Sequence, residues 1–414
     1  MSSPVILIIG TADTKADELL FLKASVERLS AEGRIMDVGI LGLPTFEPDY
    51  SKHDVALAAG TTNEDIIALG DENRAMTRQA KGAANLAKSL QEDGVIQGIL
   101  AIGGSMATDL ALDVAEVLPL GFPKFIASTV AFSPILPPHR ISPDVMMILW
   151  AGGLHGLNSI CESVLSQAAG AVVGACKTAT QSPHTRPLVG MSSLGGSTLK
   201  YMLKLKPELE DRGYEVAVFH TTGMGGRAME VLAAKGDFAA VLDLSLVEVS
   251  NHYLGSVLTA GGDRLENAGR MGIPQIVAPG GITLMDFQTW APPFEFLSDR
   301  EVHTHNRLIA CAKLTVEERV EAAKVISDKL RGATGPTAFV MPLGGIDAWD
   351  TEGGPFHDPK GLHAFAECMR DGLEGSSVEL HEINDHINDE GFSEAILSIF
   401  DRWVDDDLIT KGIL

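Results

Sequence analysis

Four short turns rich in glycine and hydroxyl side chains are the parts of this sequence best suited to binding a phosphate group. Glycine lets a ligand approach the backbone closely, and serine and threonine hydroxyls add hydrogen-bond donors. None of the turns has the spacing of a P-loop or of the G-x-G-x-x-G motif, and each could equally be a structural turn. Their recurrence favours a pocket lined by at least two of them. The turns consist of Gly10 and Thr11; Gly103, Gly104 and Ser105; Gly195, Gly196, Ser197 and Thr198; and Gly223, Met224, Gly225 and Gly226.

The first turn also carries charged residues that could contact a nucleotide directly. Lys15 could pair with a phosphate, and Asp13 could hold a ribose hydroxyl or a water molecule bound to a metal ion. Thr11 and Thr14 add hydroxyl groups to the same turn. In the alternative interpretation Asp13 caps the turn and Lys15 is solvated. The sequence predicts a nucleotide loop at these residues and leaves both interpretations open.

Two histidines and one glutamate in the second half of the chain could do metal or acid–base chemistry. His303 and His305 form an H-x-H pair, and Glu248 is a candidate partner from another segment. Imidazole and carboxylate groups bind zinc, manganese or iron, and either can act as a general base. Their spacing matches no specific zinc motif, so surface or hydrogen-bonded loop histidines remain the alternative.

Buried strands alternate with amphipathic helices along the chain, and these elements must position the candidate residues. Residues 5–9 are all aliphatic, which is typical of a strand buried on both faces of a parallel sheet, and a second strand is predicted over residues 36–42. The alternation predicts an α/β fold with doubly wound parallel sheets. In such sheets ligands bind at the carboxyl ends of the strands, where these glycine turns lie.

The length of the chain, 414 residues, favours two domains over one. A polar, proline-bearing stretch at residues 178–186 separates two series of strands and helices. The sequence therefore predicts two Rossmann-like subdomains, residues 1–182 and 183–414. Residues 280–314 show no periodic pattern over a long stretch, which predicts an irregular functional loop, lid or interface.

The composition limits the possible partners and location. The chain has 55 acidic against 32 basic side chains and a formal net charge of −23, so it repels nucleic acid and no such partner is expected. The cysteines are far apart in the sequence, which indicates a reduced, cytoplasmic protein. We see no signal peptide, and no uninterrupted apolar stretch approaches the ~20 residues of a membrane helix. The cysteines are Cys161, Cys176, Cys311 and Cys368.

Several long motifs, in order along nearly the whole chain, resemble those of one family. They read VILIIGTADTKADELLFL at 5–22, AIGGS at 101–105, FHTTGMGGRAME at 219–230, DRLENAGRMGIPQIVAPG at 263–280, HTHN at 303–306, GGPFHDP at 353–359 and DHINDEGF at 385–392. The chain is similar to the ATP-binding domain family named after the tomato mosaic virus resistance protein, which includes bacterial members. The resemblance implies two Rossmann-like subdomains, bound ATP and a homodimer. It also implies that residues 10–15 form the first nucleotide loop, with residues 103–105 beside it.

These observations lead to one expected function and two rivals. We expect a cytoplasmic, homodimeric protein that binds ATP, alone or with Mg²⁺ or another divalent metal, and is an enzyme acting on an unknown small molecule. The first rival is a metal-dependent hydrolase or lyase that acts on a small acid through Glu248, His303 and His305. The second rival is a non-catalytic interaction protein that a nucleotide stabilises.

Overall fold

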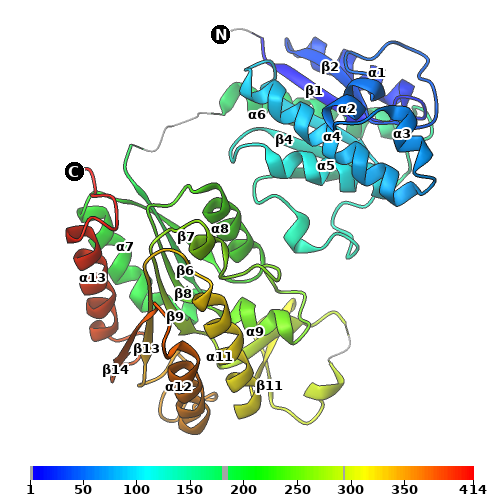
Figure 1. Cartoon of the computed structure of the whole chain (residues 1–414). Helices are drawn as coiled ribbons and strands as arrows, with labels where there is room; N and C mark the ends of the chain where they lie inside the picture. The colour runs from blue at the N-terminus through cyan, green and yellow to red at the C-terminus, as the bar shows by residue number, and fades with distance from the viewer. Residues whose placement is uncertain (1–2, 180–184, 292–293) are drawn as a thin grey trace. The chain divides into compact units, whose positions relative to one another are not determined.

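Residues 3–179, 185–291 and 294–414 are described by the computed structural model (Figure 1). They divide into two units, Met1–Ser182 and Pro183–Leu414, called unit 1 and unit 2 below. The predicted boundary between residues 182 and 183 itself lies outside the described residues.

Unit 1 is built on a five-stranded parallel sheet with the strand order β2-β1-β3-β4-β5. Its strands are β1 (Val5–Gly10), β2 (Glu32–Asp37), β3 (Gly98–Gly103), β4 (Lys124–Ser128) and β5 (Met146–Leu149). Its helices are α1 (Ala16–Arg28), α2 (Lys52–Ala58), α3 (Asn63–Ala68), α4 (Glu72–Glu92), α5 (Ser105–Val117) and α6 (Ser159–Thr178), with a 3₁₀ turn at Pro138–Arg140.

Strand β1 lies inside this sheet and is buried on both faces. Ile6 and Ile8 pack with helices α1 and α6, whereas Leu7 and Ile9 pack with α4 and α5. Successive side chains of a strand point to opposite faces, so an all-aliphatic strand requires helices on both sides of the sheet. The aliphatic run at residues 5–9 therefore produces the doubly wound arrangement that the sequence predicts.

The second strand is displaced from its predicted position. It runs over Glu32–Asp37 instead of 36–42, and it begins with polar residues because it is an edge strand of the sheet, to which the described residues add only an isolated bridge from Met36 to Tyr50 on the side away from β1. The apolar residues that suggested a longer strand, Val38, Ile40 and Leu41, line a cavity instead. The prediction was wrong here because apolar residues that line a cavity resemble those of a strand.

Helix α6 is the one described helix that is long and apolar enough to cross a membrane by length and composition. Six of its residues, Cys161, Leu165, Ala168, Ala169, Val172 and Val173, are buried in the core of unit 1. Helices in the core of a soluble protein can be equally long and apolar, so the length and composition of α6 do not by themselves indicate a membrane span.

Unit 2 is built on a six-stranded parallel sheet with the order β14-β13-β9-β8-β6-β7. The strands of this sheet are β6 (Leu188–Ser193), β7 (Glu215–His220), β8 (Ala240–Ser245), β9 (Gln275–Gly280), β13 (Thr337–Pro342) and β14 (Glu379–Ile383). Its helices are α7 (Leu199–Asp211), α8 (Met224–Lys235), α9 (Val247–Tyr253), α10 (Asn267–Arg270), α11 (Val316–Arg331), α12 (Pro359–Leu373) and α13 (Glu390–Asp405), with 3₁₀ turns at Gly195–Thr198 and Glu295–Leu297.

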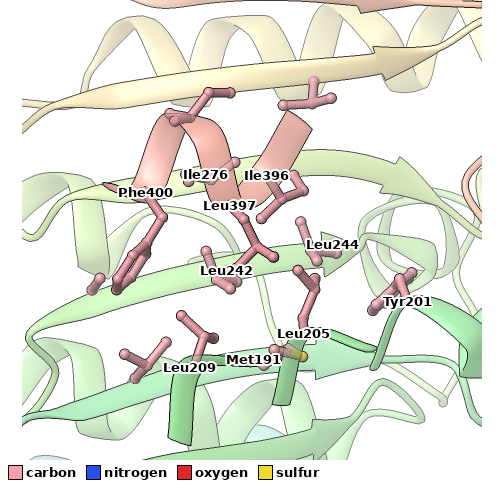
Figure 2. Close-up of a cluster of buried hydrophobic side chains, with 14 of the residues drawn as sticks. Met191, Tyr201, Leu205, Leu209, Leu242, Leu244, Ile276, Ile396, Leu397 and Phe400 are labelled. Carbon is pink, nitrogen blue, oxygen red and sulfur yellow. The ribbon is translucent and has the colours of Figure 1, made fainter. Parts of the chain in front are cut away.

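Helices cover both faces of the unit 2 sheet as well. Helices α7 and α13 pack on one face, where Leu205, Leu242 and Phe400 belong to one buried cluster (Figure 2). Helices α11 and α12 pack on the other face through a second cluster that includes Val277 and Phe339. The predicted fold class, α/β with two doubly wound, Rossmann-like parallel sheets, is confirmed.

The stretch 280–314 is not the irregular loop that the sequence suggests. It contains β10 (Leu284–Gln288), β11 (Val302–Thr304) and β12 (Ile309–Lys313), which form an antiparallel sheet in the order β10-β12-β11. The strands are only three to five residues long, and β12 contains two alanines and a cysteine with little strand preference. Cross-strand pairing and burial create this small sheet, and sequence periodicity does not reveal it.

The two parallel sheets share one strand order. Numbered within each parallel sheet, the order is 2-1-3-4-5 in unit 1 and 2-1-3-4-5-6 in unit 2. The order reverses between β1 and β3 in unit 1, and between β6 and β8 in unit 2. Ligands of doubly wound sheets bind at such reversals, outside the carboxyl ends of the strands. The turns that begin at residues 10, 103 and 195 lie at these two places.

Candidate functional sites

A cavity of about 400 Å³ lies at the carboxyl ends of β1 and β2 and is called the unit-1 cavity. Thr11, Asp13 and Thr14 of the predicted nucleotide loop line it. Much of the remaining lining is aliphatic and comes from residues 38–41 and from the helices α3, α4 and α5. These other lining residues are Val38, Gly39, Ile40, Leu41, Ile66, Ile67, Gly70, Asp71, Glu72, Ala75, Met76 and Met106.

Two buried side chains hold the cavity segment at residues 39–42 in place. Lys52 is almost fully buried, and its Nζ donates to the carbonyl oxygens of residues 40, 41 and 42 at 3.1, 3.4 and 2.7 Å. The amide nitrogen of Gln79 donates to the carbonyl of Gly39 at 3.2 Å. These bonds satisfy backbone groups that a regular strand would otherwise pair. The segment is therefore fixed without being part of the sheet.

Asp37 joins the two turns that border the unit-1 cavity. One carboxylate oxygen accepts the N–H groups of Ala12 and Gly39, both at 2.9 Å. Burial raises the pKa of Asp37, while the two backbone hydrogen bonds lower it. Because the carboxylate already accepts hydrogen bonds from the backbone of both turns, we assign Asp37 a structural role.

Asp13 has a buried carboxylate oxygen, Oδ1, without a hydrogen-bond partner in the described part of the chain. The side chain lies against Gly42, where an added Cβ would come within 2.2 Å of Asp13 Oδ2. A buried acceptor left unpaired costs about 1–3 kcal/mol. A ligand hydroxyl or a hydrated cation in the cavity would remove this cost.

The other predicted residues of unit 1 border the cavity without lining it. Lys15 donates one hydrogen bond from its Nζ to the carbonyl of Leu154 and does not line the cavity. Gly10 packs against Leu19. Gly103 ends β3, Gly104 is the N-cap of α5 and Ser105 its first residue; this helix start has no side-chain cap and no acidic residue in its first turn.

A second cavity, of about 550 Å³, lies in unit 2 and is called the unit-2 cavity. The structure brings four predicted residues together here, Gly195, Gly196, Ser197 and His305. Sequence reasoning missed most of the others. The further lining residues are Leu194, His220, Thr222, Leu284, Asp286, Asn306, Ile309, Cys311, Ala348 and Trp349.

Asp286 is the carboxyl group in the lining of the unit-2 cavity. It lies on β10 opposite Cys311 of β12 and is 9% exposed. Burial raises its pKa to about 7, and the charges of Glu248 and Asp347 act in the same direction, against a hydrogen bond with Asn251. A carboxyl group with a pKa near 7 can release and take up a proton at neutral pH.

His220 is the last residue of β7 and contacts the first glycine turn of unit 2. Its Nδ1 lies 3.1 Å from the carbonyl oxygen of Ser193, which can only accept a hydrogen bond. Nδ1 therefore donates, and Nε2 of the neutral ring is left as an acceptor. Gly195 has φ of +53°, and an added Cβ there would lie 3.0 Å from the imidazole Cε1. The imidazole thus packs on the glycine turn.

The predicted histidine pair is divided between two environments. His305 lines the unit-2 cavity. His303 is exposed on β11, and its ring centroid lies 4.6 Å from that of Trp349, an edge-on contact. Burial raises the pKa of Cys311 in the same cavity to about 12, so this thiol stays protonated.

Glu248 does not join the two histidines, and its carboxylate fills the glycine turn at residues 223–226. Its Oε1 accepts the N–H groups of Gly223 and Gly226 at 2.6 and 3.2 Å, and Oε2 accepts Nε of Arg264 at 2.8 Å. The N–H groups at the start of helix α8, predicted to bind a phosphate, thus bind an internal carboxylate. Gly225 packs against the backbone of His220.

Arg264 is buried among three carboxylates of unit 2. It forms ion pairs with Glu230 at 3.3 Å, with Glu248 at 2.8 Å and with Asp243. Burial raises the pKa values of Glu230 and Glu248, and the positive charge of Arg264 opposes that shift. The group is a closed ion-pair network. Within the described residues, no group of three or more His, Cys, Asp or Glu is arranged to hold a metal ion.

The missed residues differ in whether the sequence could have revealed them. His220 ends a strand and Thr222 follows it, so their position at a carboxyl end was a usable signal. Asp286 lies in the stretch expected to be an irregular loop, and only the pairing of β10 with β12 places it at the cavity.

Two family models describe nearly the whole chain. The N-terminal domain of an uncharacterised protein family (UPF0261) matches residues 4–181, and the C-terminal domain of that family matches residues 186–404. A UPF0261 protein of Brucella melitensis is 53% identical over 99% of this chain and 98% of its own length. The ToMV resistance protein Tm-1 of Solanum lycopersicum is 29% identical over 96% of this chain and 56% of its own length. Among solved structures, a putative UDP-N-acetylglucosamine 2-epimerase from Listeria monocytogenes is similar over 66% of this chain and 79% of that chain, with 10% identity and a TM-score of 0.22.

Proposed function

The chain belongs to the uncharacterised protein family UPF0261, and we propose that it is an ATP-binding protein that holds its nucleotide in the unit-1 cavity. The observation that carries the proposal is the combination of an aliphatic cavity with a polar turn at a reversal of strand order. Purine bases bind in apolar slots, and phosphates bind at glycine turns and helix starts next to them. The family resemblance in the motifs points to the same ligand.

Three features of the unit-1 cavity fit separate parts of ATP. Ile40, Ile66 and Ile67 supply apolar surface for the adenine ring. The unpaired oxygen of Asp13 fits a ribose hydroxyl or a water molecule on Mg²⁺. The start of helix α5, beside the lining residue Met106, offers backbone N–H groups without a capping side chain or an acid in its first turn. Because Asp13, Asp71 and Glu72 line the same cavity and no Lys or Arg of the described residues does, the phosphates would bind there as the Mg²⁺ complex. Lys15 is left out because it does not line the cavity.

The proposal extends to what the resemblance implies beyond ATP. We propose a homodimer in the cytoplasm that takes part in small-molecule metabolism, and its support is the resemblance alone. Light scattering coupled to size-exclusion chromatography tests the dimer: a mass near 44 kDa, that of the 43.9 kDa chain, at every concentration contradicts it.

The first prediction tests the placement of ATP. Ile67 on α3 and Leu57 on α2 are both exposed aliphatic residues of short helices, but only Ile67 lines the cavity. We expect Ile67→Asp to weaken ATP binding at least tenfold, because a carboxylate removes apolar surface from the base and repels the phosphates. Isothermal titration calorimetry, with and without Mg²⁺, measures the dissociation constant.

Leu57→Asp is the matched control and should bind ATP within twofold of the unchanged protein. If the unchanged protein gives no binding heat with ATP under either condition, the proposed function is wrong. If ATP binds and both variants bind it equally, ATP binding stands but its assignment to the unit-1 cavity does not.

A further inference from the structure

The unit-2 cavity is lined by one carboxyl group and two imidazoles, and its described lining contains no permanently charged basic side chain. Asp286, His220 and His305 line it together with the hydroxyl or amide side chains of Ser197, Thr222 and Asn306. Its described lining includes no lysine and no arginine. An anion in this cavity would have no Lys or Arg side chain of that lining to neutralise it and would share the cavity with the Asp286 carboxyl group. The cavity therefore suits an uncharged ligand that makes many hydrogen bonds.

Trp349 adds an apolar surface to this polar lining. Its indole ring is in edge contact with the rings of Phe356 and His303, with centroids 5.3 and 4.6 Å away. Its backbone N–H donates to Asp347 at 2.8 Å. The two ring contacts hold the indole in place, and the hydrogen bond to Asp347 holds the backbone that carries it. A fixed aromatic ring offers an apolar surface to C–H groups, while the polar side chains bind hydroxyls.

Asp286 is a buried carboxyl group with other acidic residues around it, which favours its protonated form. Glu248 of α9 and Asp347, which follows β13, act on it with negative charge; Cys311 pairs with it across the small sheet, and His220 and His305 line the same cavity. Unlike Glu248 and Asp243, it forms no ion pair with the buried Arg264. Its carboxyl group, which shares a hydrogen bond with Asn251, lies in the cavity wall, where it can contact a bound molecule.

We propose that the unit-2 cavity is a proton-transfer site for a small, uncharged polyhydroxylated molecule of the sugar class, with Asp286 as the acid–base group. The Asp286 carboxylate takes the proton of a substrate hydroxyl, so that one O–H bond breaks and another forms on the carboxyl. The negative charge passes from the carboxylate to the substrate oxygen, to which the side chains of Ser197, Thr222 and Asn306 donate hydrogen bonds, and the same proton returns when the step reverses. No electrons are lost or gained and no co-reactant is required. His220 binds a second hydroxyl through Nε2. The proposal does not depend on ATP binding by unit 1.

Saturation-transfer NMR on the full chain tests the ligand class with defined probes. D-ribose and D-glucose represent uncharged polyhydroxylated molecules, and D-ribonate and D-gluconate are their carboxylate counterparts. We expect saturation transfer to the two sugars and none to the two acids. Transfer to neither sugar, or equal transfer to the sugars and the acids, would overturn the proposal.

Substitutions of Asp286 and His220 test whether these two residues bind the sugar. Asp286→Asn and His220→Ala should each raise the dissociation constant of the bound sugar at least tenfold, whereas His363→Ala, at an exposed position of α12, should stay within twofold. A variant that fails to fold is replaced by a measurement on the unchanged protein labelled with ¹³C at aspartate carboxyls. There we expect one carboxyl that titrates near pH 7 and whose midpoint moves by at least half a pH unit on saturation with sugar. A midpoint that the sugar leaves unchanged contradicts the role of Asp286.

Discussion

Three carboxyl groups of this chain have different roles because their neighbours differ. Glu248 is bonded by Arg264 and by two backbone N–H groups, so it is part of the framework. Asp286 lies in a cavity wall near other negative charges, which suits proton exchange. Asp13 keeps a buried oxygen without a partner beside the unit-1 cavity, which suits a ligand. Residue type and sequence position did not separate these roles, and the bonding partners do.

The raised pKa of Asp286 predicts a dependence of stability on pH. Its pKa is about 7 in the folded chain, whereas an ordinary aspartate has a pKa of 3.8, so between these values the folded form holds a proton that the unfolded form has released. The stabilising contribution is present at low pH and is lost as pH rises from about 4 to about 7. We expect Asp286→Asn, which stays neutral, to be more stable than the unchanged protein at pH 8 by about 2–4 kcal/mol.

Urea unfolding at pH 5 and pH 8, followed by the intrinsic fluorescence of the tryptophans, measures this difference. The advantage of Asp286→Asn should shrink at pH 5, where the unchanged carboxyl is protonated as well. Asp237→Asn, at an exposed position after α8, is the control and should show no such change between the two pH values. An equal free-energy difference at both pH values would show that Asp286 is ionised throughout.

At the scale of elements, two glycine turns of unit 2 have opposite uses. The turn at residues 223–226 starts helix α8 and is filled by the carboxylate of Glu248. The turn at residues 195–197 follows β6, and its three residues line the unit-2 cavity. Both turns are rich in glycine, which lets a ligand approach the backbone, but only the second one lines a cavity. At the first turn, glycine allows the Glu248 carboxylate to pack against the backbone. At the second turn, glycine leaves the backbone open to a molecule in the unit-2 cavity.

This difference predicts unequal effects of adding one methyl group. A Cβ at Gly226 would lie 1.7 Å from Glu248 Oε2, whereas a Cβ at Gly196 would meet nothing within 4 Å. Gly226→Ala must displace Glu248 from Arg264 and from the helix start, so we expect a loss of about 3–5 kcal/mol in the free energy of unfolding. Gly196→Ala should cost less than about 1 kcal/mol. Urea titrations of both variants measure these values, and equal losses would contradict the packing role of the first turn.

The alternation of strands and helices was predictable because buried parallel strands are nearly continuous runs of aliphatic residues. Residues 5–9 are aliphatic on both faces, and the structure confirms a doubly wound sheet around them. The edge strand β2 was misplaced, because an edge strand tolerates polar residues while the cavity segment after it is apolar. The small sheet at 280–314 was missed because its strands are short and its stability comes from pairing.

The candidate sites were only partly predictable for a related reason. Thr11, Asp13 and Thr14 could be found from the first turn, since local sequence sets that turn. Asp286 comes to the unit-2 cavity from another segment than Gly195 and His220, so its neighbours depend on tertiary pairing. Glu248 was chosen for its chemistry, yet the sequence does not show that Arg264 and the start of α8 hold it.

At the scale of the whole molecule, each buried cluster formed by the described residues draws its members from one unit. The clusters around β1 contain residues of unit 1, and the clusters around β8 and β9 contain residues of unit 2. Cooperative unfolding follows a shared core, because breaking part of a core exposes the rest of it. We therefore expect the full chain to unfold in two calorimetric transitions, one for each unit.

Adding ATP should raise the midpoint of only one of these transitions, that of unit 1, because a ligand stabilises the cooperative unit that binds it. At a free ATP concentration of about 100 times the dissociation constant, the gain is about 2.7 kcal/mol, which shifts the midpoint by about 5–10 °C for a unit of this size. Scanning calorimetry of the full chain measures both midpoints, and Gly226→Ala identifies the unit 2 transition because it lowers that midpoint alone. Ile67→Asp should remove the shift caused by ATP without merging the transitions. If ATP instead raised the transition that Gly226→Ala lowers, the nucleotide would belong to unit 2, and the open glycine turn at residues 195–197 would be its binding loop.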